Sequence, residues 1–300
     1  MKSLKVSILT ILLLALFIGI ASCNQVPATV VATIAPTATT RPAPTATAFP
    51  TLEPGDSTHK LTVNNQERSY SLHVPVGMDN SQPASVVLVF HGAGEQPTEM
   101  QQATGFLVVY PEGLGLTWNA GICCGYAVEN KIDDTAFVRQ IVSDLETITN
   151  VDPKRIYATG FSNGALLVYQ LACQMSDVLA GIAPVAGLLV YSPCQPEQPV
   201  SVLHVHGGAD TTAPYAGGGD LNLPPVEQGI STWVKVDDCD NSPKVETVQD
   251  IIKHTSYPSC QAGTAVELYL IDLGGHNWST KYVMPASQII WDFFAAHPKP

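Results

Sequence analysis

Charged side chains are scarce in this sequence, and basic ones are the scarcest. Asp, Glu, Lys and Arg make up 13% of the 300 residues, and 26 acidic residues outnumber 14 basic ones, for a net charge of −12. A chain with 45% hydrophobic residues and so few charges is neither a disordered protein nor a coiled coil. The sequence contains no cluster of basic residues that would bind a phosphate backbone. Nucleic acid is therefore not an expected partner.

The N-terminal apolar run is too short to cross a membrane comfortably. It covers the 16 residues 6–21 and follows Lys2 and Lys5, a pattern typical of a signal peptide. The residues that follow, Ile20-Ala21-Ser22-Cys23, resemble the bacterial lipobox, in which the cysteine is acylated. We expect residues 1–22 to be a lipoprotein signal peptide and Cys23 to carry a lipid anchor to the membrane. An ordinary secretory signal is the alternative, and both predict export, either to the extracellular face of a bacterial membrane or as a secreted protein.

Large apolar side chains are few in the next segment. Residues 26–51 contain 8 Thr, 7 Ala and 5 Pro. Such a segment buries too little apolar surface to offset the entropy of ordering it, and its prolines favour an extended chain. We expect residues 23–58 to be a tether and residues 59–300 to form a single domain.

Six cysteines remain beyond Cys23. An even number in an exported protein indicates disulfides. Short loop closures favour Cys173–Cys194 and Cys239–Cys260, whereas adjacent Cys123 and Cys124 either bond to each other or pair elsewhere. Their spacing resembles no zinc site, and we expect no metal.

Short apolar runs alternate with amphipathic ones in the predicted domain. The first kind predicts strands, and the second kind predicts helices with apolar residues on one face. This alternation indicates an α/β domain with a mostly parallel, doubly wound sheet and helices on both faces. The expected strands are 59–63, 69–74, 85–90, 106–110, 155–159, 181–185, 200–206 and 265–271, and the expected helices are 133–150, 165–175, 226–236 and 285–297.

One motif lies where a predicted strand meets a predicted helix. Gly160-Phe161-Ser162-Asn163-Gly164 matches G-x-S-x-G, which in this setting is typical of a tight turn that exposes a nucleophilic serine. We expect glycines at its ends because the neighbouring chain passes too close for a Cβ atom. Ser162 is the predicted nucleophile, and a glycine-rich turn with a surface serine is the alternative.

A serine nucleophile needs a histidine base and a carboxylate that orients it. In this kind of domain the chain order is serine, acid, histidine. Asp210 follows the strand 200–206, and His276 follows the strand 265–271, so we predict these two as partners of Ser162. Asp220 and Asp272 are rival acids.

The other histidines in similar positions have a simpler reading. His91, His204 and His206 end predicted strands and are expected to be structural. A metal site that combined His204, His206 and Asp210 is a less favoured alternative.

Two backbone N–H groups should hold the oxyanion of such a reaction. One is that of Asn163, directly after the nucleophile, and the other that of Ala93, in the glycine-rich turn after the strand 85–90.

Aromatic and acidic residues near these motifs are further candidates. Trp118, Tyr215 and Trp278 lie beside the site motifs and are predicted to bind substrate, with loop packing as the alternative. The run Asp237-Asp238-Cys239-Asp240 lacks the spacing of a calcium loop, and we expect it to be a solvated turn.

Taken together, these motifs resemble the α/β-hydrolase esterases grouped as polyhydroxybutyrate depolymerase-like and feruloyl or acetylxylan esterases (carbohydrate esterase family one). The resemblance spans residues 86–291, although the segment 93–105 is shorter than in that family, and Ser279 stands where the family often has proline. The motifs are VFHGAG, VVYPEG, TWNAGICCG, DD-x₂-F, RIYATGFSNGA, IAPVAG, HVHGGAD-x₃-PYAGG and GGHNW.

The resemblance implies an α/β-hydrolase fold and ester hydrolysis without a cofactor. It places the triad at Ser162, Asp210 and His276. The expected substrates are feruloyl or acetyl esters of plant polysaccharide, or short hydroxyalkanoate polyesters. Two alternatives remain, namely a non-catalytic, surface-anchored carbohydrate-binding lipoprotein on the same fold and a serine peptidase.

Overall fold

The computed structural model describes residues 49, 51–95, 105–278 and 284–300. The predicted signal peptide, Cys23 and most of the tether lie outside these residues. Over the described ranges, no helix has the length and apolarity needed to cross a membrane.

The domain begins earlier than predicted. Strand β1 starts at Gly55 and pairs with β2 along its whole length, so the boundary expected after residue 58 is wrong. The sequence signal is weak because β1 is an edge strand, and its first residues, Gly55 to Thr58, are polar and exposed.

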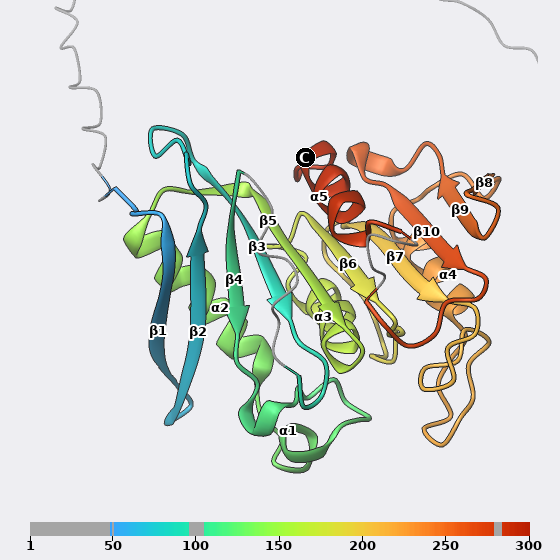
Figure 1. The fold of residues 1–300 in the computed structure, drawn as a ribbon, viewed down its shortest axis with the longest axis horizontal. Coiled ribbons are helices and arrows are strands. Elements are labelled where there is room, and N and C mark those ends of the chain that lie inside the picture. The colour runs from blue at the N-terminus through green and yellow to red at the C-terminus, as the bar shows by residue number, and fades with distance from the viewer. Residues whose placement is uncertain (1–48, 50, 96–104, 279–283) are drawn as a thin grey trace, which may run out of the picture. The chain divides into compact units, whose positions relative to one another are not determined.

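The described residues form one sheet of ten strands, in the order β1-β2-β4-β3-β5-β6-β7-β10-β9-β8 (Figure 1). The six strands from β4 to β10 are mutually parallel, as predicted, and antiparallel strands flank them on both sides. The strands are β1 Gly55–Val63, β2 Gln66–Val74, β3 Ala84–Phe90, β4 Phe106–Pro111, β5 Val151–Phe161, β6 Gly181–Val185, β7 Ser201–Gly207, β8 Lys244–Val248, β9 Ile252–Tyr257 and β10 Val266–Ile271. The hairpin of β8 and β9 was not predicted, because β8 is exposed throughout and shows no apolar alternation.

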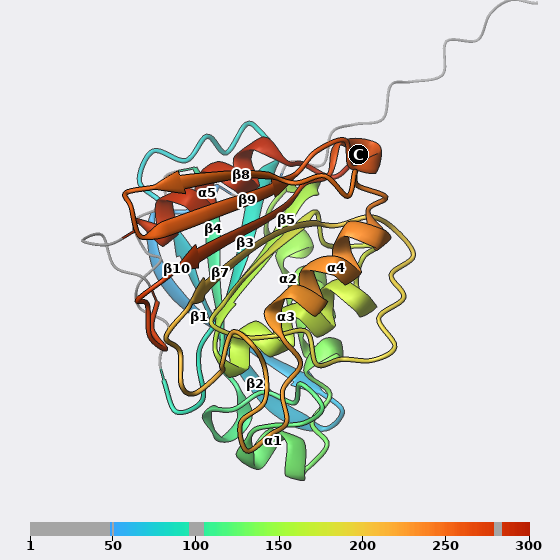
Figure 2. The ribbon, with the colours of Figure 1, turned by 90° about the vertical axis from the view of Figure 1, so that its right-hand side faces the viewer.

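Helices cover both faces of the sheet, as predicted. Figure 2 shows α2, α3 and α4 on one side and α5 on the other. Along β3, Val86 and Leu88 pack with the first group, whereas Val87 and Val89 pack with α5, so the strand is buried on both faces. The helices are α1 Gly125–Glu129, α2 Asp134–Ile148, α3 Asn163–Gln174, α4 Val226–Val236 and α5 Ala286–Ala296, with short 3₁₀ turns at Leu114–Leu116 and Gln261–Gly263.

The described residues contain three disulfides, two of which join separate parts of the domain. Cys173–Cys194 and Cys239–Cys260 form as predicted, and Cys123 and Cys124 bond to each other rather than elsewhere. The first links α3 to the loop after β6, and the second links the end of α4 to the turn after β9.

The acidic run after α4 is only partly solvated. Asp238 and Asp240 are exposed, but Asp237 is fully buried, which corrects the expectation of a solvated turn. Its Oδ1 accepts the backbone N–H of Val200 at 3.1 Å. Burial raises the pKa of Asp237 to about 7, against the opposing effect of that hydrogen bond.

Replacing Asp237 with asparagine should remove a pH dependence of stability. The carboxyl group ionises near pH 4 in the unfolded chain and at about 7 in the folded one, so the native protein loses stability as pH rises between these values. As pH rises from about 4 to about 8, we expect the free energy of unfolding of the variant to increase relative to that of the wild type by about 2–4 kcal/mol. Urea unfolding across this range measures the difference, with the exposed Asp238→Asn as control. The prediction would be contradicted if the free energy of unfolding changed equally with pH in the wild type and in Asp237→Asn.

Candidate active site

Three predicted side chains meet at the carboxyl ends of the parallel strands, the lower edge of the sheet in Figure 1. Ser162 follows β5, Asp210 follows β7 and His276 follows β10. The Nε2 atom of His276 lies 2.8 Å from the Ser162 Oγ, and its Nδ1 atom lies 2.8 Å from the Asp210 Oδ2. The structure therefore brings together the residues that the sequence motifs selected.

Ser162 occupies a tight turn between β5 and α3. Its backbone has φ 52° and ψ −117°, a conformation that L-residues rarely adopt. A Cβ atom on Gly160 would come within 2.7 Å of the Gly164 backbone, and one on Gly164 would overlap the carbonyl of Phe90. Both glycines are thus needed for the close approach of β5, α3 and the end of β3, as predicted.

Asp210 is held by backbone donors of its own loop. Its Oδ1 accepts the N–H groups of Thr212 at 2.9 Å and Ala213 at 2.8 Å, which leaves Oδ2 for His276. Burial acts to raise the pKa of Asp210, but the hydrogen bonds from His276 and the two N–H groups outweigh it and lower the pKa. The group is therefore a carboxylate at neutral pH.

The rival acids do not take this position. Asp220 and Asp272 are both exposed, and within the described chain neither forms a hydrogen bond with His276.

Two glycine-rich loops pass each other at the site. A Cβ atom on Gly207 would overlap the carbonyl groups of Gly274 and Gly275, so the end of β7 and the His276 loop approach backbone to backbone. The N–H of Ala209 donates to the Gly274 carbonyl at 2.9 Å and fixes this crossing. The crossing brings Asp210 to His276, although the two are 66 residues apart in sequence.

The predicted oxyanion donors lie on the turn after β3 and at the start of α3. In the turn, the N–H of Gly94 donates to Leu116 and that of Glu95 donates to Gly92. The N–H groups of Ala93 and Asn163 have no hydrogen-bond partner within the described chain. The N-terminus of α3 also adds the positive end of the helix dipole. Both groups remain predicted donors.

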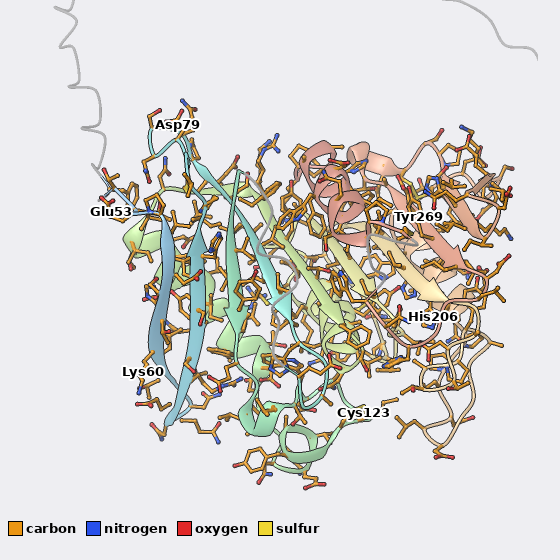
Figure 3. All side chains as sticks on the ribbon, viewed as in Figure 1. Glu53, Lys60, Asp79, Cys123, His206 and Tyr269 are labelled. Carbon is orange, nitrogen blue, oxygen red and sulfur yellow. A yellow bond between two sulfur atoms is a disulfide. The ribbon has the colours of Figure 1, made fainter. Side chains whose placement is uncertain are left out.

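The side chain of Asn163 has a second role that no sequence motif indicated. It is buried, its Oδ1 accepts the Trp118 N–H at 2.7 Å, and its Nδ2 donates to the Trp118 carbonyl at 3.1 Å. It also donates to the carbonyl of Cys123 at 3.5 Å. The residue after the nucleophile therefore anchors the loop that carries Cys123, at the same end of the sheet (Figure 3).

The three aromatic candidates differ in exposure. Trp118 is fully buried, and its Nε1 donates to the carbonyl of His91 at 2.9 Å. Its ring packs against Phe90 and cannot stack on a substrate, so that prediction is wrong, and the indole packs the loop instead. Tyr215 and Trp278 are partly exposed and stay predictions. The Tyr215 hydroxyl donates to Glu227, and the Trp278 Nε1 donates to Ser287.

His91 forms hydrogen bonds through both ring nitrogens. Its Nε2 accepts the Gly113 N–H at 3.1 Å, and its Nδ1 donates to the Gly92 carbonyl at 2.8 Å. Burial lowers its pKa. His91 therefore acts as a neutral link between the turns after β3 and β4. Among the described residues, no cluster of His, Cys, Asp and Glu has the arrangement of a metal site.

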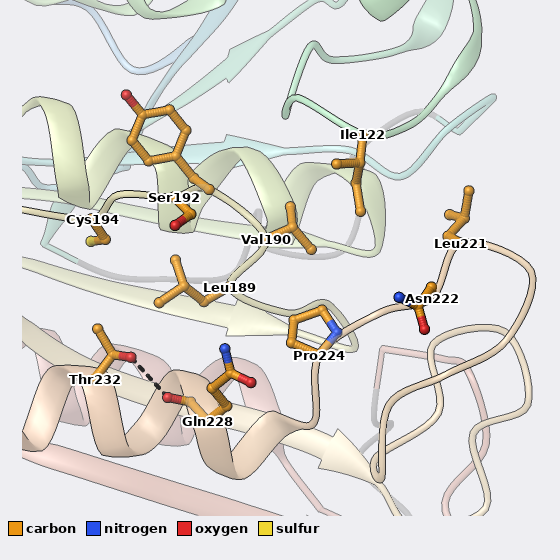
Figure 4. A pocket seen from close by; sticks show the side chains of 11 residues that line it. Ile122, Leu189, Val190, Ser192, Cys194, Leu221, Asn222, Pro224, Gln228 and Thr232 are labelled. Atoms are coloured by element: carbon orange, nitrogen blue, oxygen red, sulfur yellow. Dashed lines mark hydrogen bonds between the residues drawn. The ribbon is translucent and has the colours of Figure 1, made fainter.

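A pocket of about 450 Å³ lies between loops that leave the same end of the sheet (Figure 4). The apolar side chains of Ile122, Leu189 and Leu221 line it together with polar groups such as Asn222 and Gln228. Its lining comes from the loop before Cys123, the loop after β6, the loop after β7 and the helix α4.

Comparison with known proteins finds similarity to ester hydrolases. Residues 128–258 match the Phospholipase/Carboxylesterase family. The chain is 29% identical to feruloyl esterase B of Piromyces equi over 238 residues, which is 70% of this chain and 42% of that one. It is 25% identical to poly(3-hydroxyalkanoate) depolymerase C of Paucimonas lemoignei over 239 residues, 68% of this chain and 57% of that one. The chain thus spans about half the length of these curated relatives.

A solved structure has a similar fold. The acetyl xylan esterase from Aspergillus awamori matches with a TM-score of 0.58 and 16% identity, over 80% of this chain and 99% of that one. At this identity the match concerns the fold alone, a mostly parallel sheet with helices on both faces.

Proposed function

We propose that this protein is a serine esterase, on the premise that it has an α/β-hydrolase fold and is similar in sequence to a feruloyl esterase and a polyhydroxyalkanoate depolymerase. The observation that carries the proposal is the pair of 2.8 Å contacts that connect Ser162, His276 and Asp210. A serine activated by a histidine and a buried carboxylate is the arrangement that acyl transfer requires.

Each residue has a role in the proposed reaction. The Ser162 Oγ attacks the ester carbonyl carbon while the His276 Nε2 takes the serine proton, and Asp210 stabilises the imidazolium that forms. The N–H groups of Ala93 and Asn163 hold the oxyanion. His276 then gives its proton to the leaving alcohol. Water, activated by the same histidine, attacks the acyl-enzyme, and release of the acid restores Ser162.

The proposed substrates are esters of larger molecules. Feruloyl and acetyl esters of plant polysaccharide, and short hydroxyalkanoate polyesters, are the classes that the names of the relatives suggest. The mixed apolar and polar lining of the pocket beside Ile122 suits the chain that continues beyond such an ester. We further propose that the protein is exported and held at a membrane by a lipid on Cys23, or is secreted.

A fluorophosphonate probe tests the proposed reaction class without knowledge of the substrate. We expect the folded protein to be labelled on Ser162, located by mass spectrometry of the labelled peptide, and the heat-denatured protein to stay unlabelled. Absence of label from the folded protein would favour a non-catalytic binding protein. If label is found, turnover of methyl ferulate, acetylated xylan and polyhydroxybutyrate identifies the substrate class. Hydrolysis of peptide anilides alone would favour a peptidase.

A further inference from the structure

A buried series of hydrogen-bonded side chains connects α3, the helix that follows Ser162, to the loop that carries Asp210. Tyr169 lies on α3, and His204 and His206 lie on β7, where His206 is labelled in Figure 3. All three are at most 1% exposed. The Tyr169 hydroxyl is 2.7 Å from the His204 Nδ1, the His204 Nε2 is 3.0 Å from the His206 Nδ1, and the His206 Nε2 is 2.7 Å from the Ala213 carbonyl oxygen.

The last acceptor of this hydrogen-bonded series determines which ring nitrogens carry hydrogen. A carbonyl oxygen can only accept, so the His206 Nε2 carries a hydrogen and donates it to Ala213. Burial lowers the pKa of both histidines, so each ring is neutral and holds one hydrogen. The His206 Nδ1 therefore accepts from the His204 Nε2, and the His204 Nδ1 accepts from the Tyr169 hydroxyl. With every hydrogen donated in the direction from Tyr169 to Ala213, each of these hydrogen bonds has one donor and one acceptor.

Ala213 transmits this arrangement to the acid. Its carbonyl accepts from His206, while its N–H donates to the Asp210 Oδ1 at 2.8 Å. The His206 Nε2 is itself 3.7 Å from the Asp210 Oδ2, the oxygen that faces His276. One carboxylate oxygen of Asp210 therefore accepts from Ala213, whose carbonyl His206 binds, and the other oxygen lies near His206 itself.

We propose that Tyr169, His204 and His206 are positioning residues that hold the Asp210 carboxylate in the orientation that His276 needs. The inference rests on the proposed function. Tyr169 lies within α3, the helix that begins directly after Ser162. The hydrogen-bonded series therefore links the helix that follows the nucleophile to the loop that carries Asp210. A neutral His206 also leaves His276 as the histidine that carries positive charge beside Asp210 during turnover.

Substitutions of His206 separate positioning from packing. Glutamine places an N–H donor where the His206 Nε2 lies, whereas asparagine places its donor near Nδ1, too far from Ala213. We expect His206→Asn and His206→Phe to lower kcat and the rate of fluorophosphonate labelling by about 10- to 100-fold, with KM nearly unchanged. His206→Gln should keep both rates within about threefold of the wild type. His254→Phe, which removes a hydrogen bond to Glu267 on β10, serves as the histidine control.

A double variant tests whether His206 acts through Asp210. In an Asp210→Asn background, His206→Asn should reduce the remaining labelling rate by no more than about threefold, because two residues that act as a unit are not additive. Full additivity, equal rates for the Gln and Asn variants, or wild-type rates for His206→Phe would overturn the inference. Labelling of the wild type separates these outcomes from failure of the proposed function, in which no variant would be labelled. If His206→Phe does not fold, the comparison of Gln with Asn decides.

Discussion

Replacing Asp210 with asparagine should lower kcat by about 10⁴-fold. The two backbone donors, Thr212 and Ala213, hold the side-chain oxygen of residue 210 at the Oδ1 position. In the variant, the amide NH₂ must therefore occupy the Oδ2 position, 2.8 Å from the His276 Nδ1. His276 would then accept at Nδ1 and carry its hydrogen on Nε2, so it could not take the proton of Ser162. The loss follows from the wrong tautomer as well as from the lost charge.

Steady-state hydrolysis of an activated ester by the purified full chain measures this effect. Asp220→Asn provides the matched control, because this residue lies in the same long loop after β7 but is exposed. It should leave kcat unchanged. Circular dichroism and urea unfolding should show that the Asp210 variant is folded. A loss smaller than about tenfold would point to another acid and contradict the assignment of Asp210.

Replacing Arg68 with methionine should destabilise the protein by about 3–5 kcal/mol. The Arg68 Nη2 donates to the Asp134 Oδ1 at 2.8 Å, and both side chains are at most 1% exposed. The guanidinium also lies 3.9 Å above the ring of Phe137. Without arginine, the carboxyl group of Asp134, at the start of α2, stays buried, and among the described residues the Asn119 N–H is the donor that remains to it.

The loss of stability in Arg68→Met should increase as pH rises. Burial raises the pKa of Asp134 even in the wild type, and removal of the cation raises it further. An acid with a raised pKa costs stability as pH increases, so Arg68→Met should be more destabilising at about pH 8 than at about pH 5. Urea unfolding at both pH values measures this. The double variant Arg68→Met, Asp134→Asn should recover part of the stability.

An exposed ion pair on the same hairpin is the control. The Nζ atom of Lys60 on β1 lies 2.9 Å from the Oε1 atom of Glu67 on β2, and both side chains are largely exposed. Lys60→Met should change stability little, since exposed pairs contribute little. A loss in Lys60→Met similar to that in Arg68→Met would show that burial does not set the strength of these pairs.

Much of the fold could be predicted because its central strands are buried on both faces. Strand β4, Phe106–Pro111, is fully buried, so its sequence is a continuous apolar run. Such runs are visible without knowledge of their neighbours. The edges were harder, since β8 is exposed at every position and the first residues of β1 are exposed too. Where a strand packs against nothing, its sequence carries no apolar pattern.

The sequence-based predictions fail mainly where a single polar or amphipathic side chain is buried. The sequence motifs predict that Trp118 binds substrate, but an indole beside such a motif can equally well be packed inside a loop. The backbone N–H of Trp118 donates to Asn163, 45 residues away, and its indole is buried in the domain. The acidic run predicts a solvated turn at Asp237, yet this residue caps the end of α4 and is buried inside the domain. Neither outcome is encoded in the residues next to it in the chain.

The candidate site divides in the same way between sequence and tertiary structure. The sequence by itself determined that Ser162, Asp210 and His276 each follow a parallel strand, and parallel strands end at one edge of a sheet. The tertiary structure alone decided that their side chains meet at 2.8 Å, with Asp210 rather than Asp272 as the partner of His276. It also decided that charges as scarce as Arg68 and Asp134 would lie together in the core. The physical reason is that local patterns encode which residues are buried, whereas hydrogen bonds between distant residues depend on strand order and on the direction of each side chain.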